Sequence, residues 1–341
     1  MTVDLRRALI YVAIVAVAAA GPFLVPAYQA QLTELWLFVV FALTWDLVGG
    51  QMGYNSFGNV LFFGVGMYTC TVTQVGLVYD VGSYTAARGG GGTVFTFDLG
   101  QYVEGLAIGL PLGALAAALT AVVVGTLVLR MRGQYFAVCT LGLGVAAGQI
   151  ANAWTWIGAG SGMVPPRPPE AIADIGRLYY YAALALLAAV FVFLNWLYST
   201  RFKLAINAIR DDEDKAEAMG HFTTRIKVTA WTIAALFLGI AGGIYGNLKR
   251  FIDPLNVAFP AATIGVWMIL MAILGGKGTI VGPIIGAVIF QITKELFWTY
   301  LLGWQRVALG LLIVLIVVFF PQGIVGWWRA RRAPALATRA A

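Results

Sequence analysis

Residues 105–129 read Gly-Leu-Ala-Ile-Gly-Leu-Pro-Leu-Gly-Ala-Leu-Ala-Ala-Ala-Leu-Thr-Ala-Val-Val-Val-Gly-Thr-Leu-Val-Leu and contain no charged side chain. An α-helix needs about 20 predominantly apolar residues to cross the roughly 30 Å hydrocarbon core of a bilayer, and this stretch is long enough. Charged residues are also absent from 8–33, 47–79, 133–166, 178–200, 228–248, 254–276 and 307–328. The sequence therefore predicts a polytopic membrane protein.

The composition excludes a soluble protein. Apolar residues make up 60% of the 341 residues and charged residues 11%, against about 25% charged in typical soluble domains. No globule of this size has enough interior to bury so much apolar surface. Uninterrupted runs such as Leu311–Phe320 also lack the alternation of a transmembrane β-strand. We expect an all-α bundle of about ten spans, with some broken helices, at 8–27, 35–50, 58–76, 104–129, 135–157, 178–199, 227–247, 261–274, 283–298 and 304–320.

The distribution of positive charge predicts the orientation. With ten spans threaded from a cytoplasmic N-terminus, most Lys and Arg residues fall on the cytoplasmic side. Both termini are then cytoplasmic, and the net charge of +7 reports topology rather than binding to nucleic acid. The threading gives an outer Gly-rich loop at 77–103, a cytoplasmic loop at 201–226 and a basic cytoplasmic tail at 327–341. A cleaved signal peptide is the alternative for the first span, but the membranous remainder favours an uncleaved one.

Part of the outer loop has an alternating pattern. Phe95, Phe97 and Leu99 alternate with Thr96 and Asp98. This pattern suits a short strand that packs on the outer surface or on a partner. A plain connector is the alternative and the commoner case for loops.

The chain offers little for metal, redox or nucleotide chemistry. Cys70 and Cys139 lie in apolar runs and His221 is the single histidine. These cannot supply the ligand cluster of a zinc or haem site, so we expect no metal site, no cofactor and no catalytic residue. Gly275-Gly-Lys-Gly-Thr279 is not a phosphate-binding loop, because Met271 and Gly278 stand where that motif needs Gly and Ser or Thr. Any ATP must therefore bind to another chain.

The only long polar stretch contains a predicted short surface helix. It reads Asp211-Asp-Glu-Asp-Lys-Ala-Glu-Ala-Met-Gly220, with acids in the N-terminal turn and a glycine just beyond the end. Ala216 and Met219 are three residues apart, and Glu213 and Glu217 lie on another face. We therefore expect one side to dock while the other remains in water. A plain solvated loop is the alternative.

Blocks in a fixed order along the chain carry a resemblance to a known family. Arg132-Gly-Gln-Tyr-Phe-Ala-Val-Cys-Thr-Leu-Gly142 is similar to the block R-G-x-Y-F-A-x-x-T-L-G. Further blocks are Gly53–Tyr68, Gly158–Met163, Ala205–Gly220, Leu274–Ala287 and Pro321–Gly326. Together they resemble the branched-chain amino acid permease family of ATP-binding cassette importers. In that family the Ala205–Gly220 block holds an EAA-like coupling helix, and here Glu217, Ala218 and Gly220 match the E-A and the following Gly.

The resemblance implies a single transmembrane permease domain over 1–341. It implies cytoplasmic ATPase subunits that bind the ATP, a homologous second permease subunit and an extracytoplasmic solute-binding protein as partners. The location would be the cell membrane of a prokaryote, the inner membrane if Gram-negative. The residues expected at the ATPase contact are Arg210, Asp211, Asp212, Glu213, Glu217, Ala218 and Gly220.

A glycine cluster marks the expected solute path. Gly49, Gly50, Gly53, Gly58, Gly64 and Gly66 permit either a helix break beside a path or tight helix packing. Interrupted helices often line transport paths, and the expected pore residues are Asp46, Asn55, Ser56, Asn59, Gln134 and Tyr135. For Asp46, a local hydrogen bond and a proton relay are both open. Three positions depart from the family: Asn59 replaces a usual His, Val145 a frequent Glu and Asp46 a commoner Asn.

These features predict a permease subunit that moves a small hydrophilic solute into the cytoplasm. Neutral amides and hydroxyls in the path suit a zwitterionic or amide solute. The resemblance implies branched-chain or other neutral amino acids, with urea or short amides as the alternative. An ion-coupled secondary transporter is a further alternative, but apart from Asp46 the spans contain almost no ionisable group. A membrane enzyme is disfavoured because His221 has no partner motif.

Overall fold

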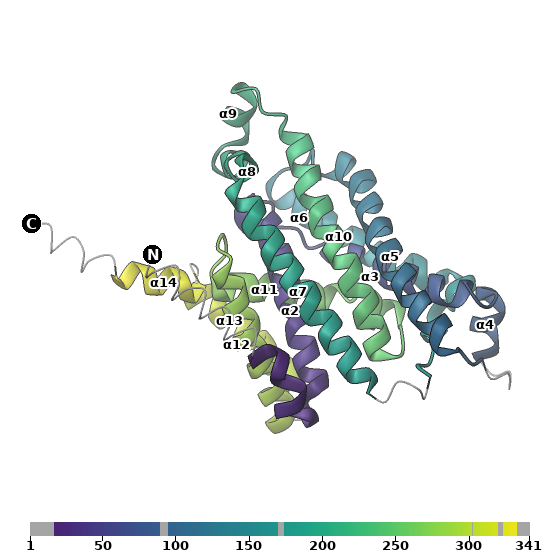
Figure 1. Ribbon diagram of the computed structural model, residues 1–341. Coiled ribbons are helices and arrows are strands. Elements are labelled where there is room, and N and C mark those ends of the chain that lie inside the picture. Colours follow the sequence, from purple (N-terminus) through teal and green to yellow (C-terminus); the bar gives the residue numbers. More distant parts are fainter. Residues whose placement is uncertain (1–16, 89–94, 170–173, 302, 320–322, 333–341) are drawn as a thin grey trace, which may run out of the picture.

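The structure, a computed structural model, describes residues 17–88, 95–169, 174–301, 303–319 and 323–332. These residues form a helical bundle in which none lies in a strand, and Met163 and Ile252 form an isolated antiparallel bridge. The helices are α2 (Gln29–Asp46), α3 (Asn59–Gly76), α4 (Val81–Arg88), α5 (Leu99–Val128), α6 (Gly133–Ala153), α7 (Ile175–Ser199), α8 (Arg201–Asp211), α9 (Glu213–Ala218), α10 (Thr223–Lys249), α11 (Val266–Gly275), α12 (Val281–Tyr300), α13 (Gln305–Phe319) and α14 (Gly323–Arg332). Figure 1 shows α8 and α9 at one end of the bundle and α4 at the other, and we call these the α9 end and the α4 end.

The predicted polytopic all-α bundle is confirmed. In the described part of the chain, 7 helical segments are long and apolar enough to cross a bilayer, namely Pro26–Gln51, Leu99–Val128, Gly133–Ala153, Ile175–Ser199, Thr223–Lys249, Pro254–Gly275 and Val281–Tyr300. α3 and α4, bent by 97° at their junction, would together make an eighth span. The total of ten stays a prediction, because the expected spans 8–27 and 304–320 extend beyond the described residues.

The first described span ends within the glycine cluster. α2 passes into a π-helical turn at Leu47–Gln51, and residues 52–58 follow without helix or strand before α3 begins. Gly53 has a φ of +82°, a backbone conformation that residues other than glycine rarely adopt. A Cβ atom at Gly50 would overlap the Asp46 carboxylate. The π-helical turn and the loop after it therefore depend on glycine at positions 50 and 53.

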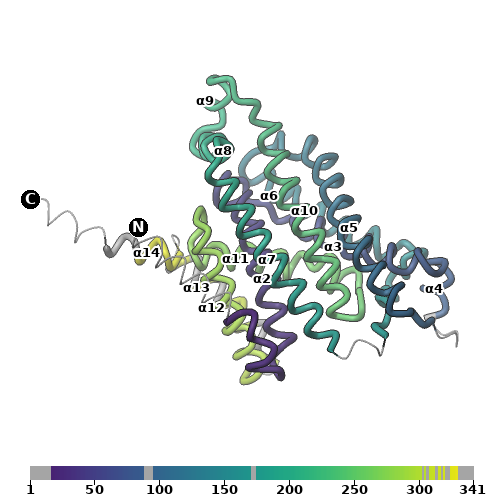
Figure 2. The backbone as a smooth tube through the Cα atoms, in the orientation of Figure 1, coloured from purple at the N-terminus to yellow at the C-terminus, as the bar shows by residue number. Residues whose placement is uncertain are grey.

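Other glycines of the same cluster serve helix packing. A Cβ atom at Gly66 in α3 would overlap the backbone of Gly239 in α10. One at Gly113 in α5 would lie 2.8 Å from the carbonyl oxygen of Gly66. α3, α5 and α10 thus pack backbone against backbone at the centre of the bundle (Figure 2). The glycine cluster therefore permits both the non-helical segment between α2 and α3 and the close packing of the helices.

Two π-helical turns precede α11. The turn at Ala261–Gly265 replaces the first part of the predicted helix 261–274, and the turn at Pro254–Ala258 lies before it. Prolines explain this difference, because they donate no backbone hydrogen bond and disfavour helical conformation in the preceding residue. A Cβ atom at Gly64 in α3 would overlap the ring of Phe259, so this interrupted segment lies directly against α3.

The α4 end differs from the loop expected at 77–103, because this segment contains α4 and the start of α5. Residues 95–98 form no strand, so the predicted short strand is wrong. Phe95 and Phe97 instead pack on Tyr79 and Tyr84 of the same chain, with ring centroids 4.9 to 6.2 Å apart. The glycine run at 89–92 lies outside the described residues.

Candidate functional site

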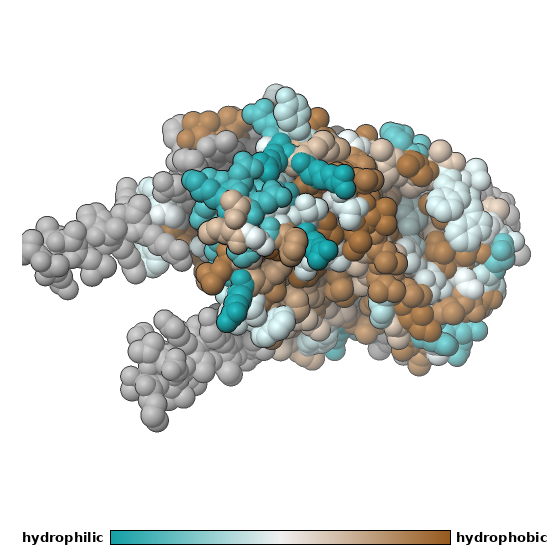
Figure 3. All heavy atoms as spheres, turned by 90° about the horizontal axis from the view of Figure 1, so that it is seen from above, coloured by the Kyte–Doolittle hydropathy of each residue, from teal (hydrophilic) through white to brown (hydrophobic). Residues whose placement is uncertain are grey.

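Two short helices follow α7 at the α9 end. Thr200 caps α8 by accepting a hydrogen bond from the Phe202 N–H, and Asp212 caps α9 by accepting one from the Lys215 N–H. Seen from this end, hydrophilic residues gather over α8 and α9 beside a largely hydrophobic surface (Figure 3). The predicted polar segment 201–226 is therefore a structured surface and not a plain solvated loop.

α9 is the predicted short helix, and it ends at the predicted glycine. Gly220 has a φ of +88°. Its N–H donates to the Glu217 carbonyl, and the His221 N–H donates to the Ala216 carbonyl. These two bonds form a Schellman motif, which requires a left-handed residue at the position of Gly220. The end of α9 therefore depends on this glycine.

The faces of α9 are divided differently from the expectation. Ala216 is buried within the chain itself, whereas Met219 is 70% exposed. The Glu213 side chain is 10% exposed, whereas Glu217 is exposed to solvent. The shared docking face of Ala216 and Met219 is therefore wrong. Glu213 and Ala216, three residues apart within α9, lie on one face and both turn inward. Met219 lies beyond the end of α9, as its C-cap, and does not follow this spacing.

Lys227, near the start of α10, is 2% exposed. Its ammonium donates to the Leu129 carbonyl (2.6 Å), to Glu213 Oε1 (2.7 Å) and to the Tyr54 hydroxyl (3.1 Å). Three donors thus meet three acceptors, which satisfies a buried ammonium. The Tyr54 hydroxyl in turn donates to Glu213 Oε2. We call Tyr54, Glu213 and Lys227 the hub.

Arg132 extends the hub to the solvent. Its Nε lies 3.3 Å from Glu213 Oε2, and its Nη1 donates to Asp214 at 2.7 Å. Burial alone would raise the pKa of Glu213, but the hydrogen bonds from Lys227 and Tyr54 and the charges of Lys227 and Arg132 outweigh it and lower this pKa. Burial and the bond to Glu213 raise the pKa of the Tyr54 hydroxyl. At neutral pH the hub therefore holds an ionised carboxylate and a neutral phenol.

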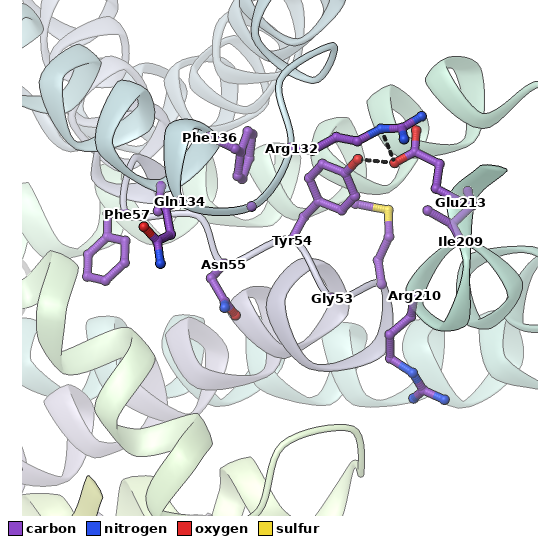
Figure 4. A pocket seen from close by; sticks show the side chains of 13 residues that line it. Gly53, Tyr54, Asn55, Phe57, Arg132, Gln134, Phe136, Ile209, Arg210 and Glu213 are labelled. Carbon is purple, nitrogen blue, oxygen red and sulfur yellow. Dashed lines mark hydrogen bonds and ion pairs between the residues drawn. The ribbon is translucent and has the colours of Figure 1, made fainter.

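A pocket of about 370 Å³ lies beside the hub. Its walls come from residues 52–57, from the start of α6 and from α8 and α9. In Figure 4, Tyr54, Arg132 and Glu213 point toward one another on one side, whereas Asn55 and Gln134 lie on the other. The pocket thus has one wall of paired charges and one of neutral amides.

The structure brings together two of the predicted pore residues, Asn55 and Gln134, both of which line this pocket. Tyr135 follows directly on α6 and is 81% exposed. All three are on the surface of the single chain. Their place in a solute path stays a prediction.

The other predicted pore residues lie elsewhere. Ser56 and Asn59 are buried. The Ser56 carbonyl accepts a hydrogen bond from the indole of Trp45 (2.7 Å), and Asn59 Oδ1 accepts one from that of Trp231 (3.3 Å). Both residues therefore hold the start of α3 in place and do not line the pocket.

Asp46 is also buried and lies apart from the pocket. Its Oδ1 accepts a hydrogen bond of 2.7 Å from the Gly278 N–H. The end of α2 is thereby tied to the turn between α11 and α12. The local hydrogen bond, one of the two alternatives for Asp46, is present.

The predicted ATPase-contact residues divide into two sets. Arg210 and Glu213 line the pocket. The remainder lie around α9, half-buried at Asp212 and exposed at Asp211, Glu217, Ala218 and Gly220. Sequence reasoning missed Tyr54 and Lys227. The available signal was a lysine within the first two turns of a span, where a charge needs a buried partner.

Within the described residues, no group of three or more His, Cys, Asp or Glu side chains could hold a metal ion. Both cysteines are free. Cys70 is buried where α3 meets α5 and α10, and Cβ atoms at Gly109 and Gly243 would lie 3.2 and 3.1 Å from its sulfur.

Comparison with known proteins identifies relatives along most of the chain. The family model described as "Branched-chain amino acid transport system / permease component" matches residues 28–319. The high-affinity branched-chain amino acid transport system permease protein LivM of Salmonella typhimurium is 26% identical over 94% of this chain and 75% of its own length. The corresponding LivH of Escherichia coli K12 is 31% identical over 42% of this chain and 44% of its own. A probable LivM of Methanocaldococcus jannaschii is 26% identical over 44% and 47%. No solved structure matches the chain.

Proposed function

This chain belongs to the family of permease components of branched-chain amino acid transport systems, and on that premise we propose that it is the membrane-spanning subunit of an ATP-driven importer. It moves branched-chain or other neutral amino acids into the cytoplasm, and a separate subunit binds and hydrolyses the ATP. The position of α9 supports this function most. α9 is exposed at one end of the bundle. Its first residue, Glu213, is nevertheless hydrogen-bonded to Tyr54, in the loop between α2 and α3 that lines the pocket.

The α9 end is the surface for the ATPase and faces the cytoplasm. Asp214 and Glu217 expose carboxylates there. Met219 and Phe222 are each 70% exposed, although both are apolar. A partner groove with an apolar floor and a basic rim fits this combination. Arg210 and Asp211, paired at 3.0 Å, border the same surface.

The pocket lies at the cytoplasmic mouth of the solute path. In the described part of the chain, the side chains of Asn55 and Gln134 make no hydrogen bond, so their amides are free to bind a passing solute. Neutral amides bind the charged groups of a zwitterion without holding it as tightly as an ion pair. A transport path needs such weak binding, since the solute must also leave.

The partners follow from the family. Relatives named LivM and LivH both match this chain, which supports pairing with a homologous second permease subunit. An extracytoplasmic binding protein delivers the solute at the α4 end. The assembly resides in the cell membrane of a prokaryote, the inner membrane if Gram-negative.

The test is association with the ATPase. We expect Glu217→Lys to abolish copurification with the cognate ATPase subunit, because it reverses an exposed charge on α9. Gly220→Pro should do the same, because proline cannot adopt a φ of +88°. Glu104→Lys, the same charge reversal at the exposed start of α5, is the control and should leave association intact. Copurification and ATP-driven uptake retained in both α9 variants would contradict the proposal.

Solute identity has its own measurement. Thermal shift of the cognate binding protein against leucine, isoleucine, valine, other neutral amino acids, urea and short amides ranks the candidates. A shift with neutral amino acids supports the proposed solute. A shift with urea or amides alone would replace it while leaving the ATP-driven mechanism in place.

A further inference from the structure

The hub joins segments that are far apart in sequence. Leu129 follows the end of α5, Lys227 stands near the start of α10, and Tyr54 follows the π-helical turn that ends at Gln51. Glu213 is the first residue of α9. The charged side chains of the other α9 residues are exposed, for example 78% at Asp214. Among the described side chains of α9, Glu213 is the one that is hydrogen-bonded to the pocket loop.

A chain of aromatic rings leads from Tyr54 into the bundle. The Tyr54 ring lies 5.2 Å from that of Phe136, Phe136 lies 5.9 Å from Trp231, and Trp231 lies 4.9 Å from Phe62, between ring centroids. The Trp231 indole also donates to Asn59. Because interiors are close-packed, a displacement of the first ring must displace its neighbours. These contacts run from α9 to the start of α3.

We propose that the Tyr54–Glu213 hydrogen bond is the mechanical link through which a push on α9 changes the pocket and the start of α3. The inference rests on the proposed function, because it requires an ATPase that moves α9. If α9 moved away from the pocket loop, the Glu213 carboxylate would lose the hydrogen bond from the Tyr54 hydroxyl while only 10% exposed. A buried acceptor that loses its donor is unfavourable. The hub therefore keeps α9 and the loop moving as one unit.

A movement of the hub would also move Asn55, which is proposed to bind the solute. Asn55 follows Tyr54 in the chain, so any shift of the Tyr54 backbone carries the Asn55 amide with it. Tyr54, in the loop before α3, and Glu213, at the start of α9, both line the pocket. Tyr54 and Glu213 are positioning residues in this mechanism, and the pocket opens or closes as they move.

The test measures coupling in the complete complex. Tyr54→Phe removes the hydroxyl and keeps the ring that packs on Phe136. Glu213→Gln keeps an acceptor for the Lys227 ammonium and weakens the bond to Tyr54. Tyr54 and Glu213 are turned into the chain, 8% and 10% exposed, and not toward the surface proposed for the ATPase. We therefore expect both variants to copurify with the ATPase and to hydrolyse ATP, while the solute transported per ATP falls at least tenfold. Glu104→Gln, the same change at an exposed carboxylate on α5, is the control and should leave this ratio unchanged, because Glu104 lies neither on α9 nor in the pocket.

A double variant separates this link from a general structural role. If Tyr54 and Glu213 act through one contact, Tyr54→Phe combined with Glu213→Gln should lower the ratio no further than either change alone. The inference would be overturned if the double variant lowered the solute transported per ATP by the product of the two single effects. It would also be overturned if the single variants left this ratio unchanged. The wild-type complex tests the proposed function by itself. Absence of ATPase binding and uptake there would refute the function, whereas full coupling in the variants would refute only the link.

Discussion

At the scale of single residues, Lys227 stabilises the α9 end. Its ammonium is almost completely buried and has an acceptor for each of its three donors. Lys227→Met would leave the Glu213 carboxylate, 10% exposed, without this partner. Removing one partner of a buried ion pair typically costs about 3 to 5 kcal/mol. We expect a clearly lower midpoint of thermal unfolding of the purified chain in detergent.

Lys215→Met is the matched control on the same surface. Lys215 is 81% exposed, and its ion pair with Asp212 lies in solvent. Pairs of that kind contribute little because water and salt screen them. Its unfolding midpoint should equal that of the wild type. Equal losses in the two variants would show that Lys227 stabilises the chain no more than a surface lysine.

Glu213 gives the α9 end a defined dependence on pH. Its pKa in the folded chain lies below the usual value of 4.5. The stabilisation from the ionised carboxylate is therefore fully present above that value and is lost as the pH falls through the folded pKa. We expect wild type and Glu213→Gln to differ in unfolding midpoint by a constant amount from pH 7 to about pH 5, and this difference to shrink at lower pH. A difference that grows on acidification would contradict the assignment.

The hub also shows what the sequence leaves open at this scale. The acids of α9 and its stop at Gly220 follow from local rules for helix ends, and the structure contains both. The partners of Glu213 do not follow from such rules, because Tyr54, Arg132 and Lys227 meet it only once α5, α6 and α10 have packed. A charged residue was predicted to face solvent, and tertiary contacts turned it inward.

At the scale of elements, long apolar runs predicted most of the helices, and local capping signals predicted α9, whereas α4, α8 and α14 were not predicted. α3 was expected at 58–76 and runs from Asn59 to Gly76. α2 begins at Gln29, although Glu34 limited the prediction to 35–50. That acid is tolerated inside the helix because Lys294 in α12 donates to it at 2.9 Å and Lys249 in α10 pairs with it as well. α4 has no apolar run, and its place was given to a loop.

The central packing of α3, α5 and α10 yields a prediction of its own. Gly66→Ala would place a Cβ atom into the backbone of Gly239, so the helices must separate or distort. Overpacking of this kind costs about 1 to 3 kcal/mol. Gly142→Ala in α6 is the matched control, because a Cβ atom there meets nothing within 4 Å. In the isolated chain we expect a lower unfolding midpoint for Gly66→Ala only. A loss in neither variant would mean that α3 and α10 can move apart freely.

At the scale of the whole molecule, the described residues leave the pocket open on one side. Asn55 and Gln134 line a pocket whose neighbouring surface includes Tyr135 with 81% of its side chain exposed. Val138 and Ile150 continue the same helix with 70% and 65% exposed. Neutral polar groups at the edge of an apolar helix face cannot remain open to lipid without loss of hydrogen bonds. A second permease subunit that covers the start of α6 would enclose them.

Cross-linking at Tyr135 tests this enclosure. In a Cys139→Ser background, which removes the less buried of the two native thiols, Tyr135→Cys should give a cross-linked pair when the chain is expressed with its homologous second permease carrying a cysteine at the aligned position. Val192→Cys on α7 is the control, because it is similarly exposed at 66% but belongs to a helix that packs on α2 and α10 and not on α6. A short bis-maleimide should therefore join the subunits through position 135 and leave position 192 uncoupled. Coupling through 192 alone would move the interface to the α7 side, and the pocket beside Gln134 would then open to lipid instead of to a shared path.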